Sequence, residues 1–123
     1  MARPALTRRL TITVDADWRH ALRDAAGAAF GADEYLGETL NFETPAAFFG
    51  RLTGRRWALL QLLQREGALT MDALARLARR APRSIAEDIA ELLDLGLVEQ
   101  TADGCIACPF ADIHVDMHLR EAV

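Results

Sequence analysis

Arginine side chains are concentrated in the middle of the sequence, where they could bind the phosphates and base edges of a nucleic acid. Residues 51–84 carry eight arginines against two acidic residues, a net charge of +6, although the whole chain has a net charge of −4. Residues 1–50 and 85–123 have net charges of −2 and −8. A basic segment between acidic ends can present a phosphate-binding face. A solvated helical surface would have the same composition, so charge alone leaves both interpretations open. The eight arginines are Arg51, Arg55, Arg56, Arg65, Arg76, Arg79, Arg80 and Arg83.

The start of a predicted helix at Pro82 carries the best candidates for contact with base edges. They are Arg83, Ser84 and Glu87. Arginine can form two hydrogen bonds with guanine, serine can bond several bases, and glutamate can accept from cytosine. Other arginines nearby would contact phosphates, which position a protein on a duplex. The simpler alternative is that all these residues are solvated helix ends. The expected phosphate contacts are Arg55, Arg56, Arg79 and Arg80.

A metal site is the second chemistry that the residue types suggest. Cys105 and Cys108 precede His114 and His118, and cysteine with histidine is a common zinc ligand set. Residues three apart on a strand face opposite sides, so both sulfurs would not reach one ion. We therefore expect no metal, and Asp112 and Asp116 are expected to be solvated. The sequence contains no nucleophile elbow, phosphate-binding glycine loop or His-Glu metal motif, so neither an enzyme nor a cofactor is expected.

Three predicted helices followed by a hairpin would position the arginines. Apolar spacing and terminal signals predict helices over 55–66, from Thr70 to about Ala78, and from Pro82 to Gly96. The buried residues of the third helix would be Ile85, Ile89, Leu92 and Leu93. After Gly96 the apolar period changes to two, with strands at 97–101 and 105–108 around an Asp-Gly turn. This order predicts a mainly helical α+β fold, a winged helix-turn-helix, in which the third helix enters the major groove.

The two ends of the chain are predicted to form a dimer interface. Leu10–Val14 alternates like a half-exposed strand, a helix is expected over 16–30, and residues 31–43 are interpreted as a connecting loop. A helix follows over 45–52, burying Phe48, Phe49 and Leu52. Residues 113–119 alternate as a strand, with a short helix as the alternative. We therefore expect a strand-helix extension over 1–43 that dimerises, with residues 111–119 contributing, and a DNA-binding domain over 44–123. The simpler alternative is that both end segments only cover their own core. Its interface residues would be Leu10, Ile12, Val14, Trp18 and Leu22.

The sequence resembles MarR-like winged helix-turn-helix proteins, predicted transcriptional regulators often encoded beside small toxin genes and called antitoxin-like. The resemblance is clearest over 41–117. It implies DNA binding by a repressor. The sequence departs from this pattern at two places. Ala81 replaces an acidic residue that could cap the third helix, so the cap is missing or moved to Ser84. The hairpin tip at 101–104 has no arginine. The matching runs are Asn41–Pro45, Leu52–Arg56, Thr70–Ala75, Arg80–Ile89, Leu95–Val98 and Pro109–Ile113.

Three function classes fit these observations. The favoured one is a sequence-specific, autoregulatory repressor that binds double-stranded DNA as a homodimer. The alternative is an antitoxin-type module that neutralises a small toxin, for which the acidic residues 85–123 would suit a basic partner. A sensor of a small effector ranks lowest, because no effector pocket is evident. The chain has no apolar run of about 18 residues and no secretory signal, and it has two cysteines, so a cytoplasmic location without membrane contact is expected.

Overall fold

The structure, a computed structural model, describes residues 8–17 and 37–118. The chain forms two compact units: one from residues 1–50 and 112–123, the other from residues 51–111. Both helices and strands contribute, which confirms the predicted mixture of α and β structure. The predicted helix over 16–30, with Trp18 and Leu22, lies almost wholly outside the described residues. None of the described helices is long and apolar enough to cross a lipid bilayer.

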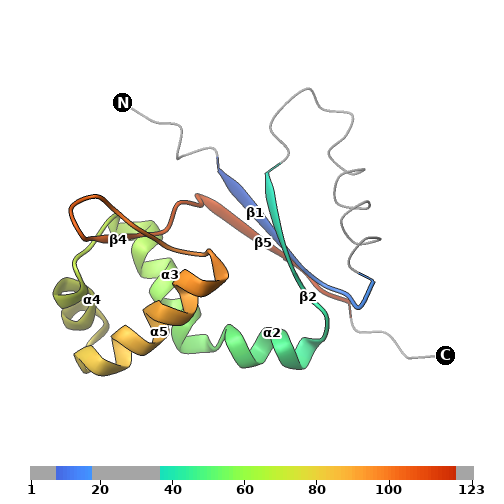
Figure 1. Cartoon of the computed structure of the whole chain (residues 1–123), viewed down its shortest axis with the longest axis horizontal. Helices are drawn as coiled ribbons and strands as arrows, with labels where there is room; N and C mark the ends of the chain where they lie inside the picture. The colour runs from blue at the N-terminus through green and yellow to red at the C-terminus, as the bar shows by residue number, and fades with distance from the viewer. Residues whose placement is uncertain (1–7, 18–36, 119–123) are drawn as a thin grey trace. The chain divides into compact units, whose positions relative to one another are not determined.

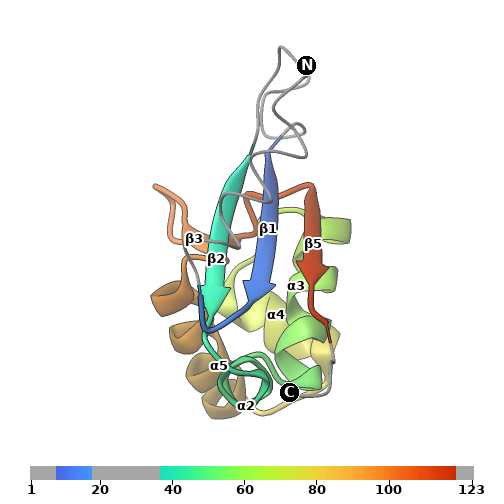
Figure 2. The same cartoon turned by 90° about the vertical axis from the view of Figure 1, so that its right-hand side faces the viewer.

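The described part of the first unit contains a three-stranded parallel sheet. Its middle strand is β1 (Arg9–Val14), with β2 (Glu38–Phe42) on one side and β5 (Asp112–Asp116) on the other (Figure 1, Figure 2). The strands predicted near residues 10–14 and 113–119 are thereby confirmed. The expectation that residues 31–43 form only a loop is wrong over β2. That strand has just two apolar side chains, Leu40 and Phe42, so its alternation is too short to indicate a strand without its partner.

The two faces of the sheet differ in polarity. On one face Ile12 pairs in register with Leu40 and Val115, and Leu10, Ile12 and Phe42 are buried. On the other face Thr13 is also buried, and its hydroxyl donates to Asn41 Oδ1 at 2.6 Å. Asn41 Nδ2 in turn donates to the carbonyl of Asp15 at 3.0 Å. The buried hydroxyl therefore has a partner, as buried polar groups generally require.

The predicted dimer interface through β1 is not available in this fold. We expected its edge to be unpaired, but β1 pairs with β2 and β5 along both edges. Leu10 is buried and Ile12 is 0% exposed, so neither side chain can contact a second chain without unfolding. Val14 is half-buried. The error arose because the strands that pair with β1 lie 24 or more residues away in the sequence, beyond the reach of local pattern analysis.

Four helices follow β2 in the described chain: α2 (Pro45–Arg51), α3 (Gly54–Glu66), α4 (Met71–Ala78) and α5 (Pro82–Leu95). A threonine hydroxyl accepts a backbone hydrogen bond at the start of each of the first three helices. Thr44 accepts from the Ala47 amide at 3.0 Å, Thr53 from the Arg56 amide at 3.4 Å, and Thr70 from the Ala73 amide at 3.1 Å. Each hydroxyl satisfies an amide that has no partner within its helix. All four helices were predicted, to within about one residue at each end.

The apolar core of the second unit lies between α3, α4 and α5. Ile85, Ile89 and Leu92 are buried as predicted, together with Leu74 of α4. Two residues that we expected to be buried are exposed instead: Leu93 of α5 is 39% exposed, and Phe49 of α2, which belongs to the first unit, is 60% exposed. Each directly follows a buried residue, and consecutive residues on a helix point about 100° apart, so the buried face of its helix does not include the second member of the pair.

A short hairpin follows α5 and completes the second unit. It comprises β3 (Glu99–Gln100) and β4 (Ile106–Ala107), both shorter than predicted. Leu69, just before α4, adds a bridge to Ile106 through two backbone hydrogen bonds of 2.9 and 2.8 Å. The chain then leaves the unit and forms β5, which pairs with β1. The boundary therefore differs from the prediction, because residues 112–118 belong with the N-terminal strand rather than with the helices.

Because Ile12 is buried in the middle of the sheet, Ile12→Asp should unfold the protein rather than dissociate a dimer. We expect a loss of about 3 kcal/mol or more in the free energy of unfolding, measured by urea denaturation. Thr39→Asp, at an exposed position of β2, is the control and should cost about 1 kcal/mol or less. An Ile12→Asp protein that kept wild-type stability and only halved its mass in light scattering would restore the interface hypothesis.

Candidate nucleic-acid interface

The exposed side of α5 carries two of the three predicted base-contacting residues. Arg83 and Glu87 are exposed and lie one helical turn apart, so they share a face. Ala86 and Ala90 on the same side are also exposed and have small side chains. Within the described part of the chain, Arg83 and Glu87 form no ion pair with each other or with other residues. A guanidinium and a carboxylate are thus available for an external partner at the start of this helix.

The turn before α5 holds Arg79 in an uncommon backbone conformation. Arg79 has a φ of 58°, in the left-handed region, and it is the non-glycine residue of the described chain with positive φ. Its amide donates to the carbonyl of Arg76 at 3.2 Å, and the Arg80 amide donates to that of Ala75 at 3.0 Å. Glycine usually occupies such a position, since a Cβ there costs roughly 1–2 kcal/mol. The Arg79 side chain is exposed to solvent.

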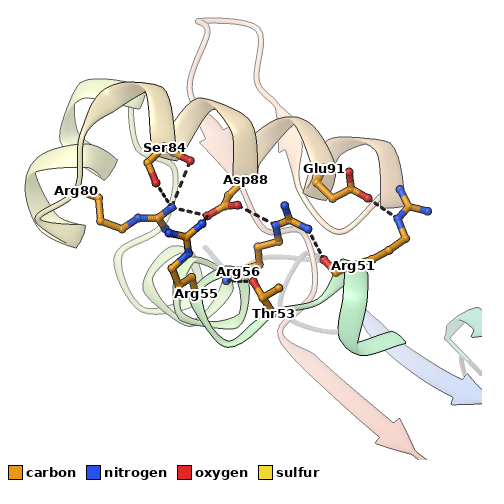
Figure 3. A network of polar contacts seen from close by, with 8 residues as sticks. All are labelled: Arg51, Thr53, Arg55, Arg56, Arg80, Ser84, Asp88 and Glu91. Atoms are coloured by element: carbon orange, nitrogen blue, oxygen red, sulfur yellow. Dashed lines mark hydrogen bonds and ion pairs between the residues drawn. The ribbon is translucent and has the colours of Figure 1, made fainter. Parts of the chain in front are cut away.

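A buried carboxylate on α5 binds two of the arginines that we expected to contact phosphate. Asp88 is 1% exposed; its Oδ1 accepts from Arg56 Nε at 2.8 Å, and its Oδ2 accepts from Arg80 Nη2 at 2.5 Å (Figure 3). Arg55 Nη2 lies 3.8 Å from Oδ2, but its side chain is 66% exposed. We call Asp88, Arg55, Arg56 and Arg80 the Asp88 cluster. In this conformation Arg56 and Arg80 are therefore bound within the chain and mostly buried, whereas Arg55 keeps most of its surface accessible.

The third predicted base-contacting residue, Ser84, is also engaged within the chain. Arg80 Nη2 donates to its hydroxyl oxygen at 2.5 Å and to its carbonyl at 3.2 Å (Figure 3). Of the two alternatives for the helix cap, a missing cap or one moved to Ser84, the structure shows the missing cap. The N-cap residue is Ala81, which provides no side-chain hydrogen bond. Of the predicted base contacts, Arg83 and Glu87 remain the accessible ones.

Sequence reasoning missed Asp88, although a signal was present. Residues 85, 88, 89 and 92 follow the spacing of one helical face, and the other three are the buried Ile85, Ile89 and Leu92. A carboxylate in such a stripe needs a charged partner, because burying an unpaired charge is very costly. The several arginines of residues 51–84 could have supplied it. A helical face defined by its apolar residues alone does not include Asp88.

The surroundings of Asp88 keep it ionised. Burial alone would raise the pKa of its carboxyl, but the hydrogen bonds and positive charges of Arg56 and Arg80 outweigh burial and hold the pKa below its usual value of 3.8. Arg56 has a further acceptor in the carbonyl of Arg51, 2.8 Å from Nη1. The cluster thus joins the end of α2, the first turn of α3 and the second turn of α5.

A second set of ion pairs binds Arg51, one of the eight arginines of the basic segment, within the chain. Its guanidinium binds Glu91 and also Asp94, whose Oδ2 lies 2.6 Å from Nη2. Hydrogen bonds to Asp94 and Glu91 raise the pKa of Arg51 above its ordinary value. Arg65 pairs with its neighbour Glu66 at 3.3 Å. Among the described residues, Arg76, Arg79 and Arg83 remain exposed without an ion pair, and Arg55 remains 66% exposed although it lies 3.8 Å from Asp88.

The hairpin tip is acidic and closed by its own hydrogen bonds. Thr101 Oγ1 bonds Asp103 and accepts from the Cys105 amide at 3.0 Å, while Gly104 turns the chain with a φ of 86°. The hydrogen bond with Thr101 lowers the pKa of Asp103, which favours its charged form. Such a tip would repel a phosphate rather than bind it.

The cysteines and histidines do not gather into a metal site within the described part of the chain. No group of three or more histidine, cysteine, aspartate or glutamate residues there could hold an ion. Both cysteines are half-buried and neither is in a disulfide, and Cys108 Sγ lies 3.6 Å from the carbonyl of Phe110. His118 Nε2 lies 3.2 Å from Asp116 in an exposed pair.

Comparison with known proteins covers the whole basic segment. Residues 51–115, more than half of the chain, match one protein family. The chain belongs to the family HVO_A0114. The HVO_A0114 match begins where the second unit begins, and it includes the Asp88 cluster, α5, the hairpin and most of β5. Curated proteins and solved structures gave no match.

Asp88 should make the HVO_A0114 segment sensitive to acid. Because the folded pKa of Asp88 lies below its usual value, the unfolded chain binds more protons in acid, and stability falls as the pH falls. The free energy of unfolding should therefore decrease between about pH 5 and pH 3, measured by urea denaturation.

The variant Asp88→Asn tests whether Asp88 is responsible for the loss of stability in acid. The variant should be about 3 kcal/mol less stable than wild type at pH 7, and the difference should shrink as the pH falls. Asp72→Asn, in the exposed first turn of α4, is the control and should cost about 1 kcal/mol or less at pH 7. A difference that stayed constant from pH 7 to pH 3 would contradict the ionised state of Asp88.

Proposed function

We propose that this protein binds duplex DNA through α5 as a winged helix-turn-helix. The observation that carries the proposal is the order α3, α4, α5 and hairpin, with an accessible Arg83 on the first turn of α5. The backbone bridge between Leu69 and Ile106 ties the hairpin to the start of α4, which supports its assignment as the wing. In this arrangement the N-terminal residues of the third helix contact base edges in the major groove.

The side chains on the exposed face of α5 fit base contact. Arg83 has five donors and no internal acceptor among the described residues, so it is free to bond guanine. Glu87 could accept from cytosine one turn later. The small Ala86 and Ala90 would allow the helix backbone to approach the base edges closely. Arg55, Arg76 and Arg79 would contribute phosphate contacts around this helix.

The biological role that best fits such an interface is regulation of transcription by an autoregulatory repressor in the cytoplasm, without enzymatic activity. The resemblance to MarR-like regulators supports this role. We keep the homodimer as part of the proposal, since two recognition helices about 34–36 Å apart would bind two half-sites. Its interface must lie outside the paired edges of β1.

One observation favours an antitoxin-type function as a second candidate. The hairpin tip carries Asp103, whose charge is favoured, close in sequence to exposed Glu99. An acidic wing suits a basic partner protein, such as a small toxin, better than it suits DNA phosphate. Binding to a random DNA library and co-purification with the product of a neighbouring gene distinguish the two functions.

Arg83→Ala tests the proposed base contact. A duplex enriched by the wild-type protein from a random library serves as the specific probe, and a shuffled duplex of equal composition as the non-specific one. The variant should lose about 1–3 kcal/mol of discrimination between them in fluorescence anisotropy, since a two-bond contact with a base is worth that much. Arg65→Ala, on the exposed end of α3, is the control and should keep wild-type discrimination. Equal discrimination by Arg83→Ala and wild type would exclude Arg83 from base contact.

Arg79 offers a test that separates DNA binding from stability. Arg79→Gly should raise the free energy of unfolding by roughly 1 kcal/mol, because glycine tolerates the positive φ. It should also weaken binding to both duplexes equally, through loss of one phosphate contact. Arg79→Ala keeps the Cβ and removes the charge, so it should weaken binding without the gain in stability. Unchanged affinity in both variants would show that Arg79 does not contact DNA.

A further inference from the structure

The Asp88 cluster lies directly behind the proposed DNA-contacting turn. Arg80 lies just before Ala81, the N-cap residue of α5, and its guanidinium extends along the first two turns to Ser84 and then to Asp88 (Figure 3). Arg56 reaches the same carboxylate from the first turn of α3. The Arg80 and Arg56 side chains are largely buried, at 17% and 20% exposure respectively. One carboxylate thus determines where two positive charges lie.

Without Asp88, the positively charged guanidinium groups of Arg56 and Arg80 would have no electrostatic reason to lie where they do. The N-terminus of a helix carries a partial positive charge, and α5 has no capping side chain to offset it. Two arginines there would repel each other and the helix end, and they would be free to turn outward. An outward-facing arginine beside a DNA-binding helix would bind any backbone phosphate, whatever the base sequence.

We propose that Asp88 is a positioning residue for sequence discrimination, which holds Arg56 and Arg80 away from DNA phosphates and fixes the first turn of α5 against α3. The inference rests on the proposed DNA binding and adds to it. Arg80 holds the first turn of α5 from its buried side, and Arg83 contacts base edges from the exposed side of the same turn. A buried ion pair adds little net stability over apolar residues of similar volume, so a geometric role accounts for it better than a stabilising one.

The test uses Asp88→Asn, which is close in shape but has no charge. On the selected duplex its affinity should fall, while on the shuffled duplex it should rise, so that discrimination falls about tenfold. The slope of log K against log salt concentration should steepen by about 0.9, because one released arginine gains a phosphate contact. A merely structural role would weaken binding to both duplexes equally and leave the slope unchanged, and that outcome would overturn the proposal.

Arg80→Gln decides the question even if Asp88→Asn does not fold, which circular dichroism would reveal. In this variant Asp88 keeps its 2.8 Å partner Arg56, so the fold should persist. Discrimination should fall while the salt slope stays at the wild-type value, since Arg80 makes no phosphate contact. A slope reduced by about 0.9 would show that Arg80 binds phosphate, and would overturn the proposal.

The wild-type protein separates this inference from the function on which it rests. If the wild type binds neither duplex, DNA binding itself is refuted, and the positioning role with it. If the wild type discriminates and both variants discriminate equally well, DNA binding stands and the positioning role of Asp88 is refuted.

Discussion

A carboxylate removed from water must be given positive partners, and the second unit is organised around this requirement at Asp88. The partners come from outside its own helix: Arg56 from the first turn of α3, and Arg80 from the turn between α4 and α5. Apolar packing of Ile85, Ile89 and Leu92 holds α5 against its neighbours but has little directional preference. The charged hydrogen bonds add direction, because each requires a particular oxygen and a particular guanidinium nitrogen. The rotation of α5 about its own axis is thereby defined.

Local signals in the sequence predicted the helices well. The threonines at positions 44, 53 and 70 and the glycines at 67 and 96 act within a few residues of themselves, so their effect is visible without knowing the fold. The same holds for the alternation of β1. In contrast, β2 could not be recognised from its own five residues, and the pairing of β1 with β5 joins segments about 100 residues apart. Pairing between distant strands is not encoded in the periodicity of either strand.

The candidate interface shows the same contrast between features that local sequence predicts and contacts between distant segments. The position of Arg83 and Glu87 at the start of a helix could be predicted from local sequence, and so could a hairpin tip without arginine. The roles of Arg51, Arg56 and Arg80 did not follow, because their partners Glu91, Asp94 and Asp88 lie outside the basic segment over which charge was summed. A net charge calculated along a window of sequence takes no account of pairs between helices. Fewer arginines are therefore available to phosphates than the composition of residues 51–84 indicates.

The order of strands in the sheet affects how the chain can fold during synthesis. The second unit is inserted between β2 and β5, and both of these strands pair with β1. Residues 51–111 leave the ribosome before β5, so the helices can assemble while one edge of β1 is still without its partner. That edge stays accessible to other chains until residues 112–116 have been made. The nascent sheet is therefore the part of the described chain most exposed to wrong pairing.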